Sequence, residues 1–413
     1  MNEPTEKALV PVLRFPEFKG VWEVKILQDL LSLTIRERKK PITPYTGLGV
    51  RSHGKGTFLK YLENPEKNSM KLLYEVQRDD LVVSITFAWE GAIAIAGLSD
   101  TGSLVSHRFP TYIFKRNIVI SEFFRYIILD KQFVYKLGVI SPGGAGRNRV
   151  LNKCDFLKLT TLLPNIEEQQ KIADCLTSLD QLINAQSQKI DLLKTHKKAL
   201  MQQLFPLEGE TVPRLRFPEF RGAGEWEAAT LGDKNVSVFV KERLSLEKLT
   251  LDNYVSTENL LPEYAGVKAA SKLPPTGSFT RFKKGDVLIS NIRPYLKKVW
   301  SANKEGASSN DVIVIRAQTK VSSHFLTCLL KNDEFINYIM KGAKGVKMPR
   351  GDISLMKDYP IAFPCISEQQ KIADCLSSLD QLINAHSQKL TTLKTHKKAL
   401  MQQLFPAVAE ELA

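Results

Sequence analysis

The sequence has little of what marks metal sites, disulfide frameworks or nucleotide-binding enzymes. Its five cysteines show no C-x-x-C spacing and no nearby cluster of histidines, which argues against a zinc site and a disulfide framework. It also lacks a G-x-G-x-x-G after a strand, H-E-x-x-H, G-x-S-x-G and the Asn/Asp-Pro-Pro-aromatic tetrapeptide of amino-methyltransferases. Gly49, Gly54 and Lys55 fit the frame of a phosphate-binding loop, but Gly56 stands where that loop needs a hydroxyl. We therefore expect no catalytic centre in this chain.

Long apolar runs are scarce as well. The first residues, MNEPTEKALVP, lack the basic start and apolar run of a secretory signal, so we expect a cytoplasmic protein. The longest apolar stretch, residues 81–98, has Glu90 and Gly91 at its centre. That pattern predicts two buried strands around a tight turn, and no membrane contact.

Acidic residues are outnumbered, with 58 Lys+Arg against 44 Asp+Glu and a formal net charge of +14. The excess is shared, because residues 1–206 hold 29 basic and 21 acidic side chains and the remainder holds 29 and 23. Two basic halves suit a long polyanion such as duplex DNA, although many unrelated cytosolic proteins are basic too. Charge alone leaves the partner open.

Two segments of the sequence occur twice. Residues 167–206 align without gaps on residues 367–406 and are identical at 34 of 40 positions. Upstream of each copy stands a shorter repeat, VLRFPEFKGVWE at 12–23 and RLRFPEFRGAGEWE at 214–227. The chain of 413 residues is therefore a tandem duplication, long enough for two cores.

Each copy of the long block is expected to form one helix. Apolar residues recur at three- and four-residue steps, and no Gly or Pro lies between Pro164 and Pro206. Asn165 with Glu168, and Ser367 with Gln370, can form capping boxes at the two starts. Forty residues of helix span roughly 60 Å, more than one small domain needs for packing.

The natural partner of such a helix is its own duplicate, in an antiparallel coiled coil. Gln186 and His386 would then fall near the midpoint, where polar residues can fix the register. A helix that only packs on adjacent domains is the alternative. The expected interface residues are Leu176, Leu179, Ile183, Gln186, Ile190 and Leu193, and Leu376, Leu379, Ile383, His386, Leu390 and Leu393.

Residues 24–163 and 228–363 are predicted to be mixed strand and helix, which makes the fold class α+β. A strand is expected within 78–86 and within 283–291, and a helix over 121–138 and over 322–342. After each helix comes a loop rich in glycine and basic residues, at 139–152 and 343–354.

These loops are the best candidates for contact with DNA, because glycine lets the backbone approach closely and basic side chains bind phosphates and base edges. The alternative is an ordinary flexible loop with solvated charge. A further basic loop lies at 51–57. The candidate DNA-binding residues are Arg147, Asn148, Arg149, Arg293, Lys344, Lys347 and Arg350.

Taken together, the chain resembles the specificity subunits of type I restriction-modification enzymes, the HsdS family. The resemblance covers nearly the whole chain. It rests on the duplicated architecture, on G-D-V-L-I-S at 285–290, and on a proline-ended strand followed by E-Q-Q-K-I-A at Pro164 and at Pro364. The first half departs from the pattern with DDLVVSI where G-D-x-L-x-S is common.

The resemblance implies a pseudo-twofold tandem repeat that reads an asymmetric, bipartite sequence in double-stranded DNA. It implies target recognition domains at 1–163 and 207–363, spacer helices at 164–206 and 364–406, and a tail at 407–413. It also implies two modification (methyltransferase) subunits as partners, together with restriction (motor-nuclease) subunits. No cofactor is expected in this chain, because S-adenosylmethionine, ATP and Mg belong to those partners, and this chain would be a non-catalytic subunit.

A different class of function stays open on the sequence: a stand-alone, sequence-specific DNA-binding protein whose helices serve only dimerisation. Such a protein would bind DNA tightly without a methyltransferase. An enzyme in its own right is disfavoured, because Glu17 and Glu219 in the short repeats have no metal-ligand partner in the sequence.

Overall fold

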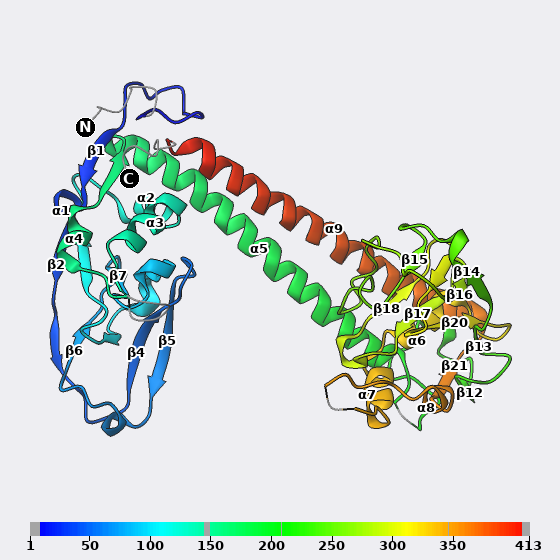
Figure 1. Cartoon of the computed structure of the whole chain (residues 1–413). Helices are drawn as coiled ribbons and strands as arrows, with labels where there is room; N and C mark the ends of the chain where they lie inside the picture. Colours follow the sequence, from blue (N-terminus) through cyan, green and yellow to red (C-terminus); the bar gives the residue numbers. More distant parts are fainter. Residues whose placement is uncertain (1–8, 144–148, 208, 346, 407–413) are drawn as a thin grey trace. The chain divides into compact units, whose positions relative to one another are not determined.

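The computed structural model describes residues 9–143, 149–207, 209–345 and 347–406. The chain divides into two compact units (Figure 1). The first unit comprises residues 1–186 and 389–413, and the second comprises residues 187–388. Each unit therefore contains one stretch of each long helix. No helix among the described residues is both long enough and apolar enough to cross a membrane.

The described residues of the first unit form three sheets and four short α-helices, besides their stretches of the long helices. Its sheets have the strand orders β1-β11, β2-β10-β7-β8 and β3-β6-β9-β4-β5. The strands are β1 (Glu23–Ile26), β2 (Leu31–Thr34), β3 (Glu37–Lys39), β4 (Tyr45–Val50), β5 (Thr57–Leu62), β6 (Leu72–Glu75), β7 (Leu81–Val83), β8 (Ile93–Ile95), β9 (Leu104–Val105), β10 (Thr111–Phe114) and β11 (Thr160–Leu163). The helices are α1 (Leu27–Leu30), α2 (Ser121–Ile127), α3 (Lys131–Val139) and α4 (Lys153–Lys158).

The second unit has the same plan. Its sheets have the orders β12-β21, β13-β20-β17-β18 and β14-β16-β19-β15. The strands are β12 (Glu227–Thr230), β13 (Ser237–Phe239), β14 (Arg243–Ser245), β15 (Tyr254–Val255), β16 (Ser278–Phe282), β17 (Val287–Ser290), β18 (Val299–Ser301), β19 (Gly306–Ser308), β20 (Val312–Ala317) and β21 (Pro360–Phe363). The helices are α6 (Ser323–Leu330), α7 (Asp333–Lys341) and α8 (Ile353–Lys357).

The two units match strand for strand, apart from β5, which is an extra edge strand of the first unit. The register agrees too, since Leu81 of β7 faces Tyr112 and Val287 of β17 faces Ile315. The predicted mixed class is confirmed, as are the strands at 81–83 and 93–95 around a tight turn in the long apolar stretch.

The helices expected over 121–138 and 322–342 are wrong in one respect, because each is two helices. The side chain of Asp130 accepts hydrogen bonds from the backbone N–H groups of Gln132 and Phe133 and so caps α3. Asn332 caps α7 in the same way, through the N–H of Glu334. Asp and Asn at these positions end one helix and start the next because their short side chains replace the missing backbone partner.

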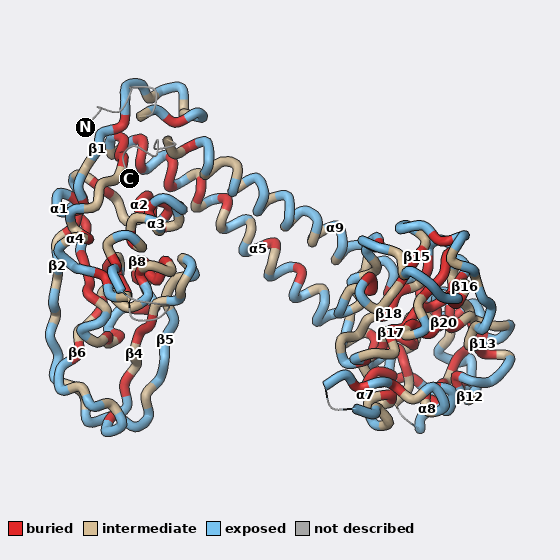
Figure 2. Tube along the Cα trace, in the orientation of Figure 1, coloured by how far each residue is buried: buried red, intermediate tan, exposed pale blue. Residues whose placement is uncertain are grey.

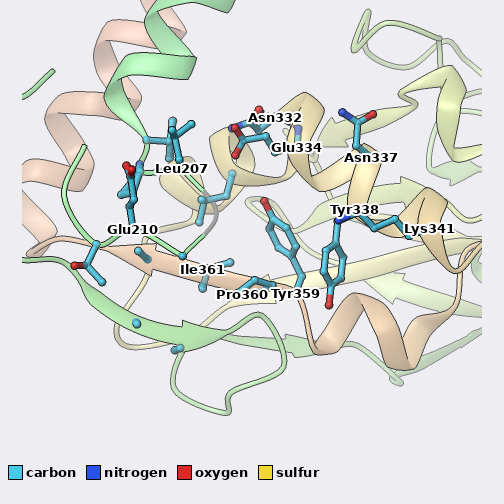
Figure 3. Close-up of a pocket in the computed structure, with 18 residues that line it drawn as sticks. Leu207, Glu210, Asn332, Glu334, Asn337, Tyr338, Lys341, Tyr359, Pro360 and Ile361 are labelled. Carbon is cyan, nitrogen blue, oxygen red and sulfur yellow. Dashed lines mark hydrogen bonds between the residues drawn. The ribbon is translucent and has the colours of Figure 1, made fainter. Parts of the chain in front are cut away.

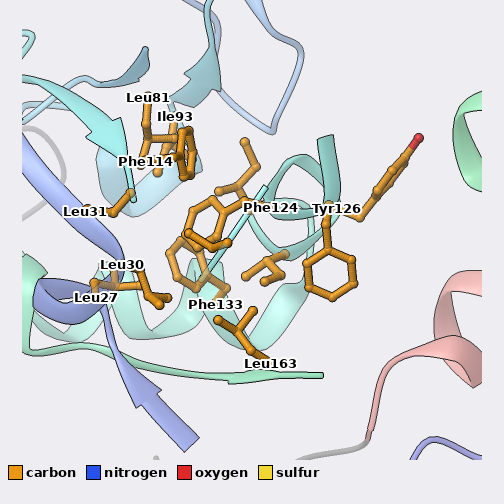
Figure 4. Packing of buried hydrophobic residues seen from close by; sticks show 14 of the residues in the cluster. Leu27, Leu30, Leu31, Leu81, Ile93, Phe114, Phe124, Tyr126, Phe133 and Leu163 are labelled. Carbon is orange, nitrogen blue, oxygen red and sulfur yellow. The ribbon is translucent and has the colours of Figure 1, made fainter. Parts of the chain in front are cut away.

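Each unit has its own apolar core, visible as the buried segments in Figure 2. In the first unit, Phe124 and Phe133 of α2 and α3 pack edge to face, with ring centroids 6.0 Å apart. Leu31 and Leu81 from the strands complete this cluster (Figure 4). The core holds the strands and short helices of the unit together, so the loops at their ends are presented from a rigid base.

The long blocks form α5 (Ile166–Leu204) and α9 (Ile366–Leu404), of 39 residues each. Within the first unit, Lys397 Nζ of α9 lies 2.5 Å from Asp180 Oδ1 of α5. Within the second unit, Lys197 Nζ lies 2.6 Å from Asp380 Oδ1. In each unit the early part of one helix meets the late part of the other, so the antiparallel pairing is confirmed.

Burial along these helices follows the predicted spacing. Among the expected interface residues, one set is buried: Leu176, Leu179, Gln186, Ile190 and Leu376. The others are half-buried: Ile183, Leu193, Leu379, Ile383, His386, Leu390 and Leu393. The side chains between them are mostly exposed, which is the pattern of a helix with one packed face.

The expected caps are half right. Asn165 Oδ1 accepts from the backbone N–H of Glu168 at 2.8 Å, as a capping box requires. The carboxylate of Glu168 does not complete the box, because Arg14 binds it. The second cap is wrong, since α9 begins at Ile366 and Ser367 already lies inside it.

The short repeat supplies the arginine that binds the carboxylate of Glu168. The segments at 12–23 and 214–227, here called the arms, lie on the helix starts. Both guanidinium nitrogens Nε and Nη2 of Arg14 bind Glu168, at 2.8 and 2.7 Å. Arg216 binds Glu368 in the same bidentate way, at 2.7 and 2.7 Å. In each unit, therefore, the arginine of the short repeat binds the glutamate of the long repeat that follows it.

Each arm also reaches the end of the other helix in its unit. The backbone N–H of Leu13 donates to Gln403 O, and that of Leu215 donates to Gln203 O, both at 2.9 Å. The Trp22 ring packs 5.9 Å from Phe405. Each arm thus ties the start of one long helix to the end of the other.

Candidate nucleic-acid interface

In the second unit, the strands β17 and β18 are joined by a tight turn, residues 291–297, here called the second turn. Its centre is a short 3-10 helix, Pro294–Leu296. Arg293 and Lys297 on either side have left-handed backbone, with φ of 52° and 53°. Such a conformation costs a non-glycine residue about 1 kcal/mol or more. The surrounding structure must hold it in place.

The basic loop of the second unit, residues 343–354, is fastened to the second turn. The backbone N–H of Arg293 donates to Pro349 O at 2.8 Å, and that of Gly351 donates to Asn291 O at 3.1 Å. Lys344 and Arg350 pair through two backbone hydrogen bonds of 3.0 and 2.9 Å, which closes the loop on itself. Two stretches that the sequence proposed separately are thus brought together on one surface.

The predicted side chains of this surface are exposed: Arg293, Lys344, Lys347 and Arg350. Arg350 Nη2 lies 3.2 Å from Asp311 Oδ1, and Lys344 Nζ lies 3.7 Å from Asp352 Oδ2. Both pairs are exposed enough that exchange for a phosphate partner costs little.

Positive charge accumulates next to the second turn. Burial lowers the pKa of Lys298, and the nearby charges of Lys268 and Arg293 lower it further. Lys298 Nζ donates to Thr257 O at 2.6 Å. A group whose ionisation is opposed by like charges marks a place where an anion is favoured.

The first unit builds the equivalent turn from different residues. The first turn, residues 85–91, joins β7 to β8 around a 3-10 helix, Ala88–Glu90, and ends on Gly91 with φ of 72°. The backbone N–H of Leu151 donates to Ile85 O at 2.8 Å and fastens the basic loop 139–152 to the turn. The two turns have the same length, because the equivalent strand pairs Val83–Ile93 and Ile289–Val299 are separated by the same number of residues.

The loop at 51–57 also lies on the first turn. The backbone N–H of His53 donates to Glu90 O at 2.7 Å, and that of Gly54 donates to Gly91 O at 3.0 Å. Ser52 Oγ donates to Glu90 Oε2 at 2.8 Å. Gly54 has φ of 63°, a left-handed backbone conformation in which a side chain would be strained. The close approach of this loop therefore depends on glycine.

Of the candidate DNA-binding residues in the first unit, Arg147 and Asn148 lie outside the described residues. Arg149 is engaged within the chain. Its Nε donates to Ser141 O at 3.1 Å and its Nη2 to Gly138 O at 3.0 Å, while the guanidinium carbon lies 5.4 Å from the ring centre of Trp89. This geometry fixes the loop and the tryptophan ring to each other.

The sequence reasoning passed over one aromatic residue in the 3-10 helix of each turn. Trp89 and Tyr295 occupy the same position, each nine residues after a shared buried aspartate, Asp80 or Asp286. Aligning DDLVVSITFAW with GDVLISNIRPY without gaps would have found them.

A cavity of about 520 Å³ also lies in the second unit, between α7 and the ribbon β12-β21 (Figure 3). Tyr338, Tyr359 and Ile361 line it, with Glu334 and Lys341 among its polar residues. No described residue of the second turn or its basic loop lines this cavity. The described residues contain no group of three or more His, Cys, Asp or Glu side chains placed to hold a metal ion.

Comparisons with known proteins agree with this architecture. The model of the type I restriction modification DNA specificity domain matches residues 20–195 and again residues 226–395. The type I restriction enzyme MjaVIII specificity subunit of Methanocaldococcus jannaschii is 24% identical over 277 residues, 62% of this chain and 63% of the relative. The EcoDI specificity subunit of Escherichia coli is 22% identical over 290 residues, 63% of each chain. These matches thus span somewhat under two thirds of the relatives' length.

Among solved structures, the S subunit of a type I restriction-modification system from M. genitalium aligns over 97% of this chain and 100% of its own, with a TM-score of 0.61 and 15% identity. At that identity the likeness concerns the fold. The family match covers most of the chain and falls once in each half, on the sheets and on most of each long helix described above. The chain therefore belongs to the family of the type I restriction modification DNA specificity domain, of which it carries two copies in tandem.

Proposed function

We propose that this chain is the DNA specificity subunit of a type I restriction-modification system. Residues 1–163 and 207–363 would be target recognition domains, each reading one half of an asymmetric, bipartite sequence in duplex DNA. One observation carries the proposal: the same strand-turn-strand frame, fastened to the same kind of loop, occurs in each unit with unlike side chains. Two units with the same backbone frame can bind two DNA half-sites in the same manner, and their different side chains can read different base sequences.

The long helices have a second role in this proposal. Their near-identical sequences would give two copies of a modification subunit the same docking surface and would set the distance between the half-sites. S-adenosylmethionine, ATP and Mg would act on the modification and restriction subunits, in the cytoplasm. This chain would supply recognition alone, which agrees with a sequence that shows no catalytic motif.

The test is a methylation map. The tagged chain is isolated from its host with its bound partners and incubated with genomic DNA and labelled S-adenosylmethionine, and methylated adenines are located by sequencing. We expect methylation confined to one split, asymmetric motif, with a large subunit recovered together with the chain. Tight DNA binding by the chain alone, with no partner and no methylation, would contradict the proposal and favour a stand-alone DNA-binding protein.

A loop variant gives the matched control. Replacing Lys344, Lys347 and Arg350 together with glutamine removes three cations from the second unit and leaves the first unit unaltered. We expect weaker binding and a relaxed second half-site, with the first half-site unchanged. Equal relaxation of both half-sites would show that the units do not read separate halves.

A further inference from the structure

We infer that Trp89 and Tyr295, the aromatic residues in the middle of the 3-10 helices of the two turns, each contact a base in one half of the DNA target. This inference rests on the proposed function. It adds two specificity-determining residues, one in each unit.

The first argument is their shared place. Both side chains stand in the middle of the 3-10 helix of their turn, Ala88–Glu90 in one unit and Pro294–Leu296 in the other. The letters around them differ completely, TFAWEG against IRPYLK. The two turns share their length, a 3-10 helix and the left-handed residue after it, but the backbone before the helix differs, with φ of −132° at Phe87 and 52° at Arg293. An aromatic ring kept in the middle of both helices therefore suggests a role that the backbone does not require.

The second argument is exposure. Tyr295 is 47% exposed, and Trp89 is half-buried. The other three tryptophans are buried: Trp22, Trp226 and Trp300 are at most 8% exposed. Trp89 is thus the one tryptophan of the chain that DNA can reach, since all four lie among the described residues.

The third argument is support from the surroundings. Arg149 donates hydrogen bonds to two backbone carbonyls, and its guanidinium lies over the Trp89 ring. It therefore acts as a positioning residue for that ring. In the second turn, the left-handed residues Arg293 and Lys297 bracket Tyr295. Backbone strain of this kind persists where surrounding structure enforces it, and it gathers at functional sites.

The partner is duplex DNA because each ring lies beside a basic loop: Arg149 of the first loop lies over the Trp89 ring, and the second turn that carries Tyr295 is fastened to the second loop. Arg293 lies on the second turn, Lys298 directly follows it, and Arg350 lies on the loop fastened to it, so this surface favours phosphates. An aromatic ring adds what cations lack, an apolar surface that discriminates among bases, for example through the methyl group of thymine.

The experiment uses the complete chain bound to its modification subunits and a DNA library randomised across the methylated motif. For Trp89→Ala we expect about tenfold weaker binding of the specific target and a changed preference at one position of the first half-site only. Tyr295→Ala is expected to do the same in the second half-site. The untouched half-site serves in each case as the control for folding, and Trp89→Phe and Tyr295→Phe should keep most of the affinity.

Fluorescence supplies a second readout. Specific DNA should quench the tryptophan emission of the wild-type complex, and the difference should vanish in the Trp89→Phe complex. Arg149→Gln should weaken the quenching, because the ring loses its support.

Two results would overturn the inference. One is Trp89→Ala and Tyr295→Ala complexes with unchanged base preferences, whether or not affinity falls. The other is quenching that survives in Trp89→Phe. Either result contradicts the inference alone if the wild-type complex still methylates a split motif. If the wild-type complex methylates no such motif, the proposed function and the inference are both contradicted.

Discussion

The two units solve the same structural problems with residues from different places. In the first unit, the buried carboxylate of Asp80 is bound by Arg36, which follows β2, at 2.6 Å. In the second, the equivalent Asp286 is bound by Arg316 on β20, at 2.8 Å, and Arg316 also binds Glu242. The helix-start contacts, by comparison, repeat residue for residue. The contacts at the helix starts are thus common to the two units, whereas the partners of the buried aspartates differ. We expect this contrast if the helix framework was kept the same while the two recognition domains diverged.

The largest expected effect concerns the arms. Arg216→Met leaves Glu368, which is 1% exposed, buried without its cation, and removal of one partner from a buried pair costs about 3–5 kcal/mol. Arg14→Met should cost less, because Trp22 Nε1 still lies 3.4 Å from Glu168. Denaturant unfolding with unit-resolved hydrogen exchange would measure both.

The control for the arms is a double replacement. Arg216→Met with Glu368→Met removes both charges, so most of the lost free energy of unfolding should return. A double variant as unstable as the single one would show that the arm is held by its other contacts, and the comparison between the arms would then lose its electrostatic basis.

The next largest effect concerns the two buried aspartates that precede β7 and β17, Asp80 and Asp286. Arg36→Met and Arg316→Met each leave a buried carboxylate with only a backbone donor, the N–H of Gln77 or of Lys283, at 2.8 Å in both cases. We expect each change to destabilise its own unit by about 3 kcal/mol. Hydrogen exchange should rise in β7 for the first variant and in β17 for the second. Exchange that rises in both units together would contradict their independence.

A smaller effect belongs to the second unit alone. Lys297 of the second turn and Lys198 of α5 lie 2.7 and 3.0 Å from the carboxylate of Asp333. Burial opposes the ionisation of Asp333, but the two lysines outweigh it and hold its pKa below the usual range. Asp333→Asn should therefore cost about 0.5–1 kcal/mol at neutral pH.

The pH dependence has a definite sign. Because the folded pKa is depressed, the contribution of Asp333 is present above the unfolded value of about 4 and is lost as the pH falls through the folded pKa. Stability of wild type and Asp333→Asn should converge as the pH falls below about 4. The matched residue of the first unit is Lys131, where α3 begins. Lys131→Ala should leave the pH dependence unchanged.

An effect of similar size, from backbone strain in the two turns, separates stability from recognition. Gly91→Ala places a side chain at φ of 72° and should cost about 1 kcal/mol, whereas Gly97→Ala, at φ of −87°, should cost less. Arg293→Gly should relieve the left-handed strain of the second turn and leave stability equal or slightly higher, while DNA binding weakens. A fall in both stability and binding would mean that Arg293 holds the turn together.

Much of this fold could be read from the sequence, because its signals are local or repeated. The long helices, the strands at 81–83 and 287–290 and the duplication follow from periodicity and identity. The break at Asp130 was missed, although its capping residue stands in the sequence. Contacts between distant segments could not be predicted from spacing. The binding of Glu168 by Arg14, 154 residues away, needs the three-dimensional path of the chain.

The candidate interfaces show the same limit. Basic loops were proposed from their composition, and the second one does carry exposed cations. Composition could not show that the donors of Arg149 go to backbone carbonyls, or that the loop at 51–57 lies on the first turn. The DNA-contacting roles of these residues stay predictions.

The arms also bear on the order in which the protein is made. The second unit is one continuous stretch, residues 187–388, whereas the first unit is incomplete until residues 389–404 exist. The bond from Leu13 to Gln403 joins nearly the two ends of the chain. Since contacts of such long range form late and slowly, the domain that is translated first should be the last to finish folding. A ribosome stalled just after residue 388 would have made all of the second unit, but the core of the first unit would still lack the residues that the end of α9 supplies.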